Sequence, residues 1–369
     1  MVNNKNHSIL FDNIIFSLQK AGGISVYWSE LLKRFIRDQY NLEIHEYLGA
    51  QNNLFRQDID ISTNQIINHS QLSLAIERYL PFLHSNKSHS IFHSSYYRFP
   101  LFFSGRVITT VFDFTYEKYK NGLGRYVHSL QKHMALSHSD GVICISTSTK
   151  NDLFDFMPTY PAERVQVIPL SYSSEFSCPD QIKHDGGEFF FTQPYLVFVG
   201  ERSGYKNFSY VIEAMKYLDD YHLVIIGGGS IETIQNELNS VCKGRYSHFQ
   251  GLTNKKLNSL YHRAHALIYP SAYEGFGLPV LEAMASGCPV IACNSSSIPE
   301  VAGNAGLLLD QINAAKIVEK VHALSHVETR AVQIQLGLNN IKRFDWEICY
   351  QSTLSFYAAI QNMPKLNKT

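Results

Sequence analysis

Residues 269–292 read Tyr-Pro-Ser-Ala-Tyr-Glu-Gly-Phe-Gly-Leu-Pro-Val-Leu-Glu-Ala-Met-Ala-Ser-Gly-Cys-Pro-Val-Ile-Ala, and this stretch decides the fold. An apolar strand over residues 266–269 leads into a turn. A helix follows, with Pro279 near its first position and Gly287 just past its end. Strand, turn and helix in this order are typical of an α/β layer, in which ligands bind beyond the carboxyl ends of the strands. The stretch therefore predicts both a layer of the fold and a place for a ligand.

The turn carries two carboxylates, Glu274 and Glu282, with Gly275 and Gly277 between them. Glycines allow a ligand to approach the backbone closely, and the start of the helix offers free N–H groups and a positive dipole end to an anion. This arrangement predicts a site for a phosphorylated, hydroxyl-rich ligand. Taken alone, the pair of carboxylates also suggests a general acid and a general base.

Apolar strand segments alternate with helical patterns over the whole chain of 369 residues, a length typical of roughly two domains. We predict an α/β protein with two doubly wound, Rossmann-like domains that face across a cleft. The first domain is expected over residues 1–175 and the second over residues 193–345, joined by a polar linker over 176–192. A tail helix over residues 346–362 is expected to pack back on the first domain.

The composition excludes several classes of protein. Lys and Arg number 32, as do Asp and Glu, so no global charge recruits nucleic acid. The six cysteines form no Cys-x-x-Cys motif and indicate reduced thiols. The start of the chain is polar, and no apolar run approaches the roughly 20 residues of a membrane span. We expect a cytoplasmic protein, with peripheral contact at the inner face of the cytoplasmic membrane left open.

Two cations follow the predicted strand at residues 195–199. Arg202 and Lys206 lie at the same predicted sheet edge as the Glu274 turn. The forked guanidinium of arginine and the compact charge of a lysine ammonium would both suit a diphosphate there. Fixed cations of this kind can stabilise a leaving diphosphate in place of a metal ion. An isolated pair of cations would more often be two solvated surface side chains. The position of this pair near the Glu274 turn favours diphosphate binding instead.

These motifs closely resemble the retaining glycosyltransferases of family 4, which have the GT-B fold, especially members that build bacterial lipopolysaccharide O-antigen or capsule. The resemblance covers most of the chain, and it is strongest from residue 195 onward. Besides residues 273–290, the matching segments are residues 21–24, 92–97, 143–146, 199–208, 226–229, 260–264 and 297–303.

The resemblance implies roles for the residues that grip the donor. Glu282 would accept hydrogen bonds from the ribose hydroxyls of the nucleotide, and Glu274 from hydroxyls of the transferred sugar. Backbone groups of Gly275, Phe276, Gly277 and Leu278 would hold sugar or phosphate oxygens. Both carboxylates then serve as hydroxyl acceptors, because a carboxylate that faced the diphosphate would be repelled.

It also implies which groups handle the diphosphate. Arg202, Lys206 and Glu274 would be the catalytic residues, with the two cations stabilising the departing diphosphate. Gly22 and Gly23, between a strand and a helix of the first domain, would approach it from the other lobe. Paired glycines by themselves indicate only a turn.

The implied reaction moves a hexose or 6-deoxyhexose from a GDP-, UDP- or dTDP-linked sugar to a saccharide with retention. The acceptor implied by the resemblance is a polyprenyl-diphosphate-linked oligosaccharide. The leaving phosphate takes the acceptor proton, so no dedicated base is expected. Neither a metal nor another cofactor is expected. Asp58-Ile-Asp60 has the spacing of metal-dependent transferases of another fold, but its polar, loop-like surroundings argue against that role.

One position departs from the family pattern. Many relatives carry His-Asp after the strand that corresponds to residues 107–112, and that histidine bonds the 6-hydroxyl of the donor sugar. Here the pair is Phe112-Asp113, and phenylalanine prefers an apolar neighbour. One hypothesis is a 6-deoxy donor whose methyl group packs on Phe112. The alternative is a divergent loop in which Asp113 or a backbone group takes over.

Two other functions remain as alternatives. A dinucleotide-dependent oxidoreductase needs a full glycine fingerprint, and Gly227-Gly-Gly229 lacks its last glycine because Glu232 stands there. A catalytically inactive sugar-nucleotide-binding protein would have lost the motif charges, which are all present.

The segment from Tyr116 to His133 interleaves basic and aromatic residues. It suits an acceptor diphosphate or an anionic lipid, and equally a solvated helix face.

Overall fold

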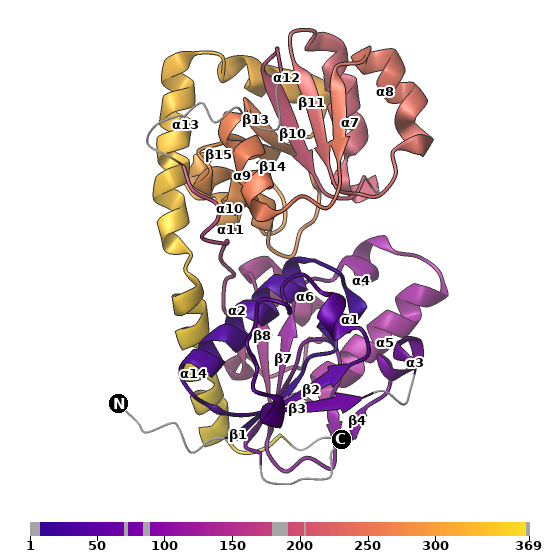
Figure 1. The fold of residues 1–369 in the computed structure, drawn as a ribbon, viewed down its shortest axis with the longest axis vertical. Helices are drawn as coiled ribbons and strands as arrows, with labels where there is room; N and C mark the ends of the chain where they lie inside the picture. Colours follow the sequence, from indigo (N-terminus) through magenta and orange to yellow (C-terminus); the bar gives the residue numbers. More distant parts are fainter. Residues whose placement is uncertain (1–7, 70–72, 84–88, 179–190, 203, 367–369) are drawn as a thin grey trace. The chain divides into compact units, whose positions relative to one another are not determined.

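The protein forms two compact α/β units, each described here by itself. A computed structural model describes residues 8–69, 73–83, 89–178, 191–202 and 204–366 (Figure 1). Unit 1 comprises Met1–Leu170 and Trp346–Thr369, and unit 2 comprises Ser171–Asp345. Most of the predicted linker, residues 179–190, lies outside the described residues.

Unit 1 is built on a seven-stranded parallel sheet in the order β3-β2-β1-β5-β7-β8-β9. Its strands are β1 Ser8–Asp12, β2 Asn41–Tyr47, β3 Ile66–His69, β5 Ile91–Ser94, β7 Arg106–Val111, β8 Gly141–Cys144 and β9 Val165–Val167, with a separate pair of β4 Phe82–Leu83 and β6 Pro100–Leu101. The helices are α1 Ile15–Leu18, α2 Gly23–Arg37, α3 Leu74–Glu77, α4 Thr115–Tyr119, α5 Leu123–Ser137, α6 Thr147–Phe156 and α14 Trp346–Asn362.

Unit 2 is built on a six-stranded parallel sheet in the order β12-β11-β10-β13-β14-β15. Its strands are β10 Tyr195–Val199, β11 His222–Ile226, β12 Tyr246–Phe249, β13 Ala266–Tyr269, β14 Val290–Cys293 and β15 Gly306–Leu309. The helices are α7 Phe208–Ala214, α8 Gln235–Cys242, α9 Asn254–Arg263, α10 Leu278–Ala285, α11 Ile298–Ala302, α12 Ala314–Ala323 and α13 Val327–Asn340.

The central strands explain why these sequences form parallel sheets. β10, β11, β13 and β14 are runs of apolar residues that are buried almost throughout, as expected where both faces of a sheet are covered. In both sheets the order doubles back from the first strand, β1 in unit 1 and β10 in unit 2. The predicted doubly wound architecture is confirmed.

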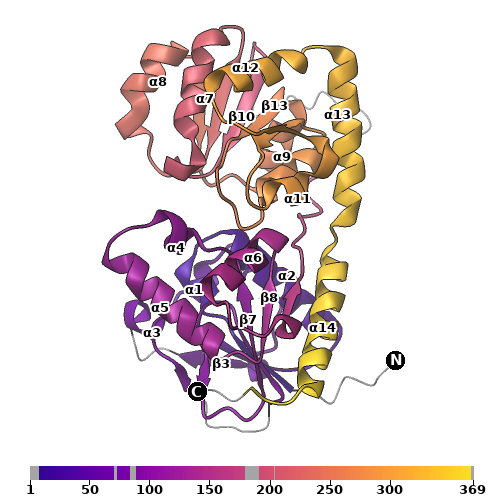
Figure 2. The same ribbon diagram turned by 180° about the vertical axis from the view of Figure 1, so that it is seen from behind.

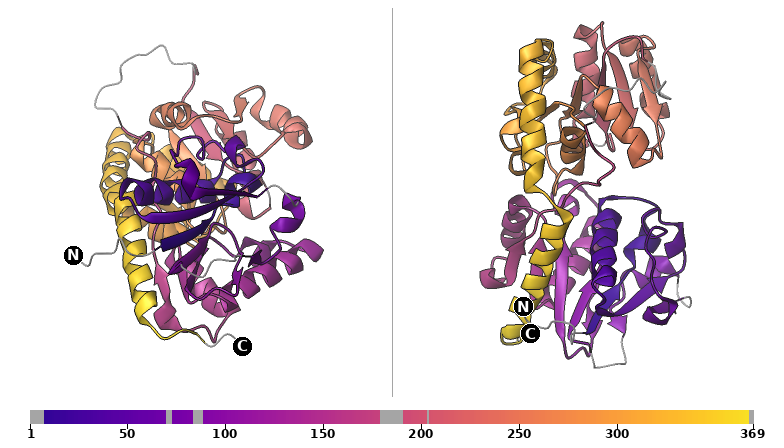
Figure 3. Two further views of the ribbon diagram at one scale, coloured as in Figure 1. Left: turned by 60° about the horizontal axis from the view of Figure 1, so that its bottom comes forward. Right: turned by 60° about the vertical axis from the view of Figure 1, so that its left-hand side comes forward.

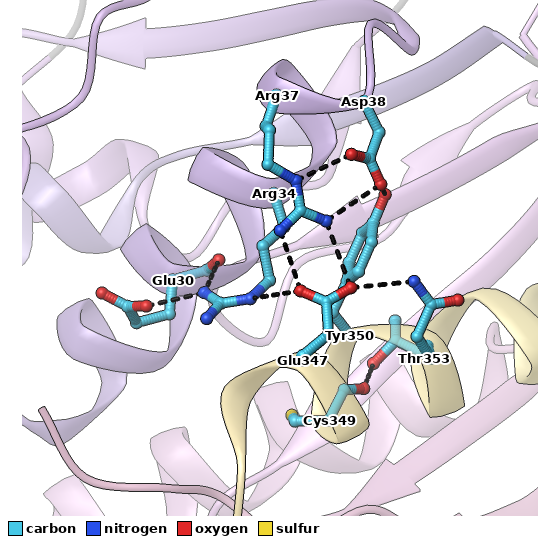
Figure 4. A network of polar contacts seen from close by, with 9 residues as sticks. Glu30, Arg34, Arg37, Asp38, Glu347, Cys349, Tyr350 and Thr353 are labelled. Atoms are coloured by element: carbon cyan, nitrogen blue, oxygen red, sulfur yellow. Dashed lines mark hydrogen bonds and ion pairs between the residues drawn. The ribbon is translucent and has the colours of Figure 1, made fainter. Parts of the chain in front are cut away.

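The tail helix α14 packs on unit 1, as predicted, where it contacts α2 and β7 (Figure 3). Gly141 makes room for it, since a Cβ at this position would lie 2.7 Å from Cγ1 of Ile360. Polar contacts tie α14 to α2 (Figure 4): Arg37 Nη1 donates to Glu347 Oε2 at 2.9 Å, and Tyr350 Oη donates to a carboxylate oxygen of Asp38 at 2.9 Å. The C-terminal helix is therefore an integral layer of unit 1.

Candidate functional site

The turn between β13 and α10 presents the start of a helix at the carboxyl end of a strand, as predicted. Gly277 caps α10 with φ of 107°, in the left-handed region that favours glycine. A Cβ there would lie 2.8 Å from Cδ1 of Ile298. Leu278 is the first residue of α10, and Pro279 stands in its first turn. The helix start therefore needs glycine for both its conformation and its packing.

Serines after β14 hold the turn in place. The backbone N–H of Glu274 donates to Ser296 Oγ at 2.8 Å, and the Ser297 hydroxyl lies 2.8 Å from the carbonyl oxygens of both Glu274 and Phe276. Ser296 itself adopts a left-handed φ of 51°. These hydrogen bonds from the serines were not predicted, because a run of serines in the sequence does not indicate which backbone groups the hydroxyls will bond.

The structure brings Lys206 and Glu274 together. Lys206 Nζ lies 2.5 Å from Glu274 Oε1, and both side chains are 13% exposed. Asn207 secures the approach of the two loops, since its side-chain amide donates to the carbonyl oxygen of Pro270 at 2.9 Å. The ammonium also lies 5.7 Å from the ring centroid of Tyr269. An ammonium and a carboxylate are thus paired at one largely buried point beside the helix start.

Arg202 has partners that the sequence did not indicate. Its two terminal nitrogens donate to four backbone carbonyls in a row, at 2.8 Å for Gly227, 2.6 Å for Gly228, 3.0 Å for Gly229 and 2.7 Å for Ser230. The three glycines have φ between 72° and 77°, and a Cβ on Gly228 would lie 2.5 Å from the guanidinium. The side chain therefore holds the loop after β11 in a left-handed conformation, and its contact with a diphosphate stays a prediction.

Glu282, in the second turn of α10, lies in an apolar setting. Burial raises the pKa of Glu282 to about 7, and the neighbouring Tyr261 hydroxyl lowers it only in part. Tyr261 is buried against this carboxylate, and the buried Tyr269 lies chiefly against Glu274. Burial first, and then the nearby glutamates, raise the pKa of both tyrosine hydroxyls. A carboxylate in this setting gains most from hydroxyl donors that a ligand brings.

The remaining predicted residues belong to unit 1. Gly22 is the extended residue before α2, and Gly23 is the first residue of this 15-residue helix. A Cβ on Gly22 would lie 2.6 Å from Gln19 Oε1, which also accepts a hydrogen bond from Ser25 Oγ. A side chain at this position would displace the amide of Gln19.

Phe112 and Asp113 follow β7. Phe112 is 7% exposed, and its ring packs edge-on against Tyr27 with centroids 5.5 Å apart. Asp113 Oδ1 accepts a hydrogen bond from the backbone N–H of Thr115 at 2.8 Å, and its carbonyl oxygen accepts one from Lys132 at 2.7 Å. These bonds fix the loop that starts α4.

The alternative metal motif lies elsewhere. Asp58 and Asp60 are both exposed on a loop of unit 1, and Ile59 between them is buried. In the described ranges, no group of three His, Cys, Asp or Glu side chains is arranged to hold a metal ion.

Two known protein families match this chain. A family described as glycosyl transferases group 1 matches residues 180–336, and one described as glycosyltransferase family 4 matches residues 21–174. Each match falls mainly within one unit, and together they span most of the chain.

Curated relatives point the same way. The O-antigen chain mannosyltransferase B of Escherichia coli is 28% identical over 240 residues, which are 61% of this chain and 62% of the relative. The O-antigen chain mannosyltransferase RfbU of Salmonella typhimurium is 30% identical over 157 residues, 42% of this chain and 44% of the relative. The matched part thus spans less than two thirds of these relatives' length.

Among solved structures, the sucrose-phosphate synthase of Thermosynechococcus elongatus superimposes with a TM-score of 0.76 at 16% identity, covering 95% of this chain and 98% of that one. This likeness confirms the predicted GT-B fold. Within the part of the chain that the structure describes, no helix is long and apolar enough to cross a bilayer.

Proposed function

We propose that this chain, which belongs to the family-4 glycosyltransferases of GT-B fold, moves a hexose or 6-deoxyhexose from a nucleotide-diphosphate sugar to a saccharide acceptor with retention. The observation that carries the proposal is the group of Lys206, Glu274 and Glu282 around the start of α10. A cation and a helix N-terminus suit a diphosphate, and two carboxylates suit hydroxyls.

The proposed reaction divides the work between these groups. Glu282 accepts hydrogen bonds from the ribose hydroxyls, and Glu274 accepts them from the transferred sugar. As the bond between the anomeric carbon and the diphosphate oxygen breaks, Lys206 and the start of α10 stabilise the charge that develops on that oxygen. The acceptor oxygen forms its bond to the same face of that carbon, and its proton passes to the leaving phosphate.

Arg202 acts in this proposal mainly through the loop that it holds. Its four bonds to carbonyls of residues 227–230 keep a glycine-rich segment at the end of β11, beside the strand that leads to Lys206. Within unit 1, Gly22 and Gly23 supply a helix start that suits an anion. The proposal needs neither a metal ion nor another cofactor, because the cation and the helix dipole supply positive charge.

For the acceptor, we propose a lipid-linked oligosaccharide of O-antigen or capsule synthesis, met at the cytoplasmic face of the membrane. The names of the two bacterial relatives, both O-antigen chain mannosyltransferases, support a surface polysaccharide as the product.

The donor proposal rests on Phe112. A ring that is 7% exposed offers an apolar contact to a methyl group and no hydrogen bond to a 6-hydroxyl. We therefore propose a 6-deoxy sugar, and turnover of GDP-mannose should be compared with that of GDP- and dTDP-linked 6-deoxy donors. A clear preference for a sugar that carries a 6-hydroxyl would refute it and leave Asp113 or a backbone group as the recognising element.

A thermal-shift screen tests the function as a whole. UDP, GDP, dTDP, their sugars and NAD are added to the full chain and to Glu282→Ala, with Glu232→Ala, an exposed carboxylate of unit 2, as the matched control. One nucleotide family should stabilise the wild type and the control, with the effect lost in Glu282→Ala. Stabilisation by NAD alone would favour an oxidoreductase, and no response to any nucleotide would refute the transferase.

A further inference from the structure

Helix α5, residues Leu123–Ser137, buries its more polar face and exposes its more apolar one. The buried side consists of His128, Gln131, Lys132, Ala135 and Leu136. The exposed side carries the apolar side chains of Leu123, Tyr126, Val127, Leu130 and Met134, together with Gly124 and His133. Their spacing of three or four residues places these apolar side chains on one stripe. A surface helix of a globular protein has the opposite pattern. We therefore expect the exposed stripe to bind another apolar surface.

Buried contacts hold α5 in this orientation. Lys132 Nζ donates to Glu117 Oε2 at 2.7 Å and to the carbonyl oxygen of Asp113 at 2.7 Å, and it lies 4.3 Å from the ring centroid of Phe114. Both members of the ion pair are buried. Turning the helix to hide its apolar stripe would separate this pair and leave a buried carboxylate without its cation. The exposure is therefore built into the fold.

Helix α4 carries two more exposed rings, Tyr116 and Tyr119, of which Tyr116 stacks on His128 of the buried side of α5. We call these two residues and the five apolar residues of α5 the apolar face. Its side chains are between 37% and 79% exposed, and the face holds seven of the twenty exposed large apolar side chains in the described ranges. Figures 1 and 2 show α4 and α5 on the outside of unit 1. An apolar cluster of this density marks an interaction site.

Two cations, Lys120 and Arg125, lie between members of the apolar face, whereas Lys118 is paired with Asp152 of α6. The one acidic residue of α4 and α5, Glu117, is buried under Lys132. Tyrosines border the leucines, which is the composition of a segment at a membrane interface. At 15 residues, α5 is about 22 Å long and suits lying flat on a bilayer.

We propose that the apolar face docks unit 1 on an anionic lipid bilayer. Leu123, Leu130 and Met134 would enter the acyl boundary, and Lys120 and Arg125 would meet lipid phosphates. Docking needs only the bilayer and goes beyond the proposed transfer. It also gives an enzyme of lipid-linked acceptors a reason to work at the membrane, but it does not depend on that activity.

Vesicle flotation tests the docking. The full chain is mixed with vesicles of phosphatidylcholine alone or with added phosphatidylglycerol. The wild type should float with the anionic vesicles, less so at high salt, and much less with the neutral ones. The double variant Leu123→Ser/Leu130→Ser should lose at least about tenfold in partitioning, since each leucine contributes buried apolar area. Val332→Ser, an exposed apolar residue of α13, should float like the wild type.

The charge contribution has its own variant, Lys120→Ser/Arg125→Ser. It should lose the preference for anionic vesicles while it keeps the weak binding to neutral ones. Absence of flotation in the wild type, or equal flotation of the leucine variant, would overturn the proposal. So would a dimer in solution that the leucine variant abolishes, because the face would then join two copies. The thermal shift with nucleotides, measured on each variant, reports folding and donor binding separately from docking.

Discussion

Replacing Glu282 by glutamine should remove a pH-dependent loss of stability from unit 2. Burial raises the pKa of this carboxyl from 4.5 to about 7. Between these two pH values the folded protein keeps the proton, whereas the unfolded chain releases it. Unfolding then releases a proton, so the free energy of unfolding falls as the pH rises through this window.

The size of the effect follows from the shift. A difference of about 2.5 between folded and unfolded pKa, at about 1.4 kcal/mol for each, amounts to about 3 kcal/mol. This is an upper limit, because the residue as a whole is half-buried and water relaxes part of the cost. Near pH 4.5 the wild type and Glu282→Gln should differ little from this cause, and above pH 7 the variant should be the more stable by up to this amount.

Urea unfolding of the full chain at a series of pH values measures this difference. Glu232→Gln, at an exposed position of the same unit, serves as the control and should follow the wild type. If the stability difference between Glu282→Gln and the wild type is the same at pH 5 and at pH 8, the assignment of a raised pKa to Glu282 is wrong.

The same carboxyl should couple nucleotide binding to pH. Ribose hydroxyls donate hydrogen bonds to the ionised form, so the proposed binding releases a proton below pH 7. Affinity for the nucleotide should therefore rise with pH up to about 7 and then level off. In Glu282→Gln the affinity should be lower and the dependence flat, which titration calorimetry in buffers of different ionisation enthalpy would show.

Lys206→Met should weaken binding of a nucleoside diphosphate about tenfold more than that of the monophosphate, because a charge-assisted contact to the outer phosphate is lost. Arg202→Met should weaken binding of the diphosphate and of the monophosphate alike, because the Arg202 side chain holds a loop. Titration calorimetry with the two nucleotides measures both effects. A loss of affinity confined to the diphosphate would show that Arg202 is a phosphate ligand. Gly277→Ala should lower the free energy of unfolding by about 1–3 kcal/mol, since φ is 107° and an apolar carbon lies 2.8 Å from the new Cβ. Urea unfolding checks it, and an unchanged midpoint would show that the turn adapts. Glu347→Ala should cost less than about 1 kcal/mol, because its ion pairs are solvent-exposed; a larger cost in the same assay would show that they act as a cooperative network.

The strands over residues 195–199 and 266–269 were predictable because each is a short run of apolar residues. Both strands stand at the predicted residues. Strand β2 of unit 1, Asn41–Tyr47, has no such uninterrupted run. It carries Glu43, His45 and Glu46 among its apolar residues, and these polar groups are accepted in the fold because partners arrive from elsewhere, as Arg56 does for Glu46. A pattern of apolar residues in the sequence does not predict such partners.

The sequence by itself determined the order of the motifs, the α/β layers and the residues that gather at the start of α10, because these follow from local spacing and from glycine and proline positions. Only the tertiary structure decided what those residues touch. Arg202 lies against carbonyls more than twenty residues away, and Glu282 holds a raised pKa. Hydrogen-bond partners and burial depend on segments that the fold brings together, so no local pattern encodes them.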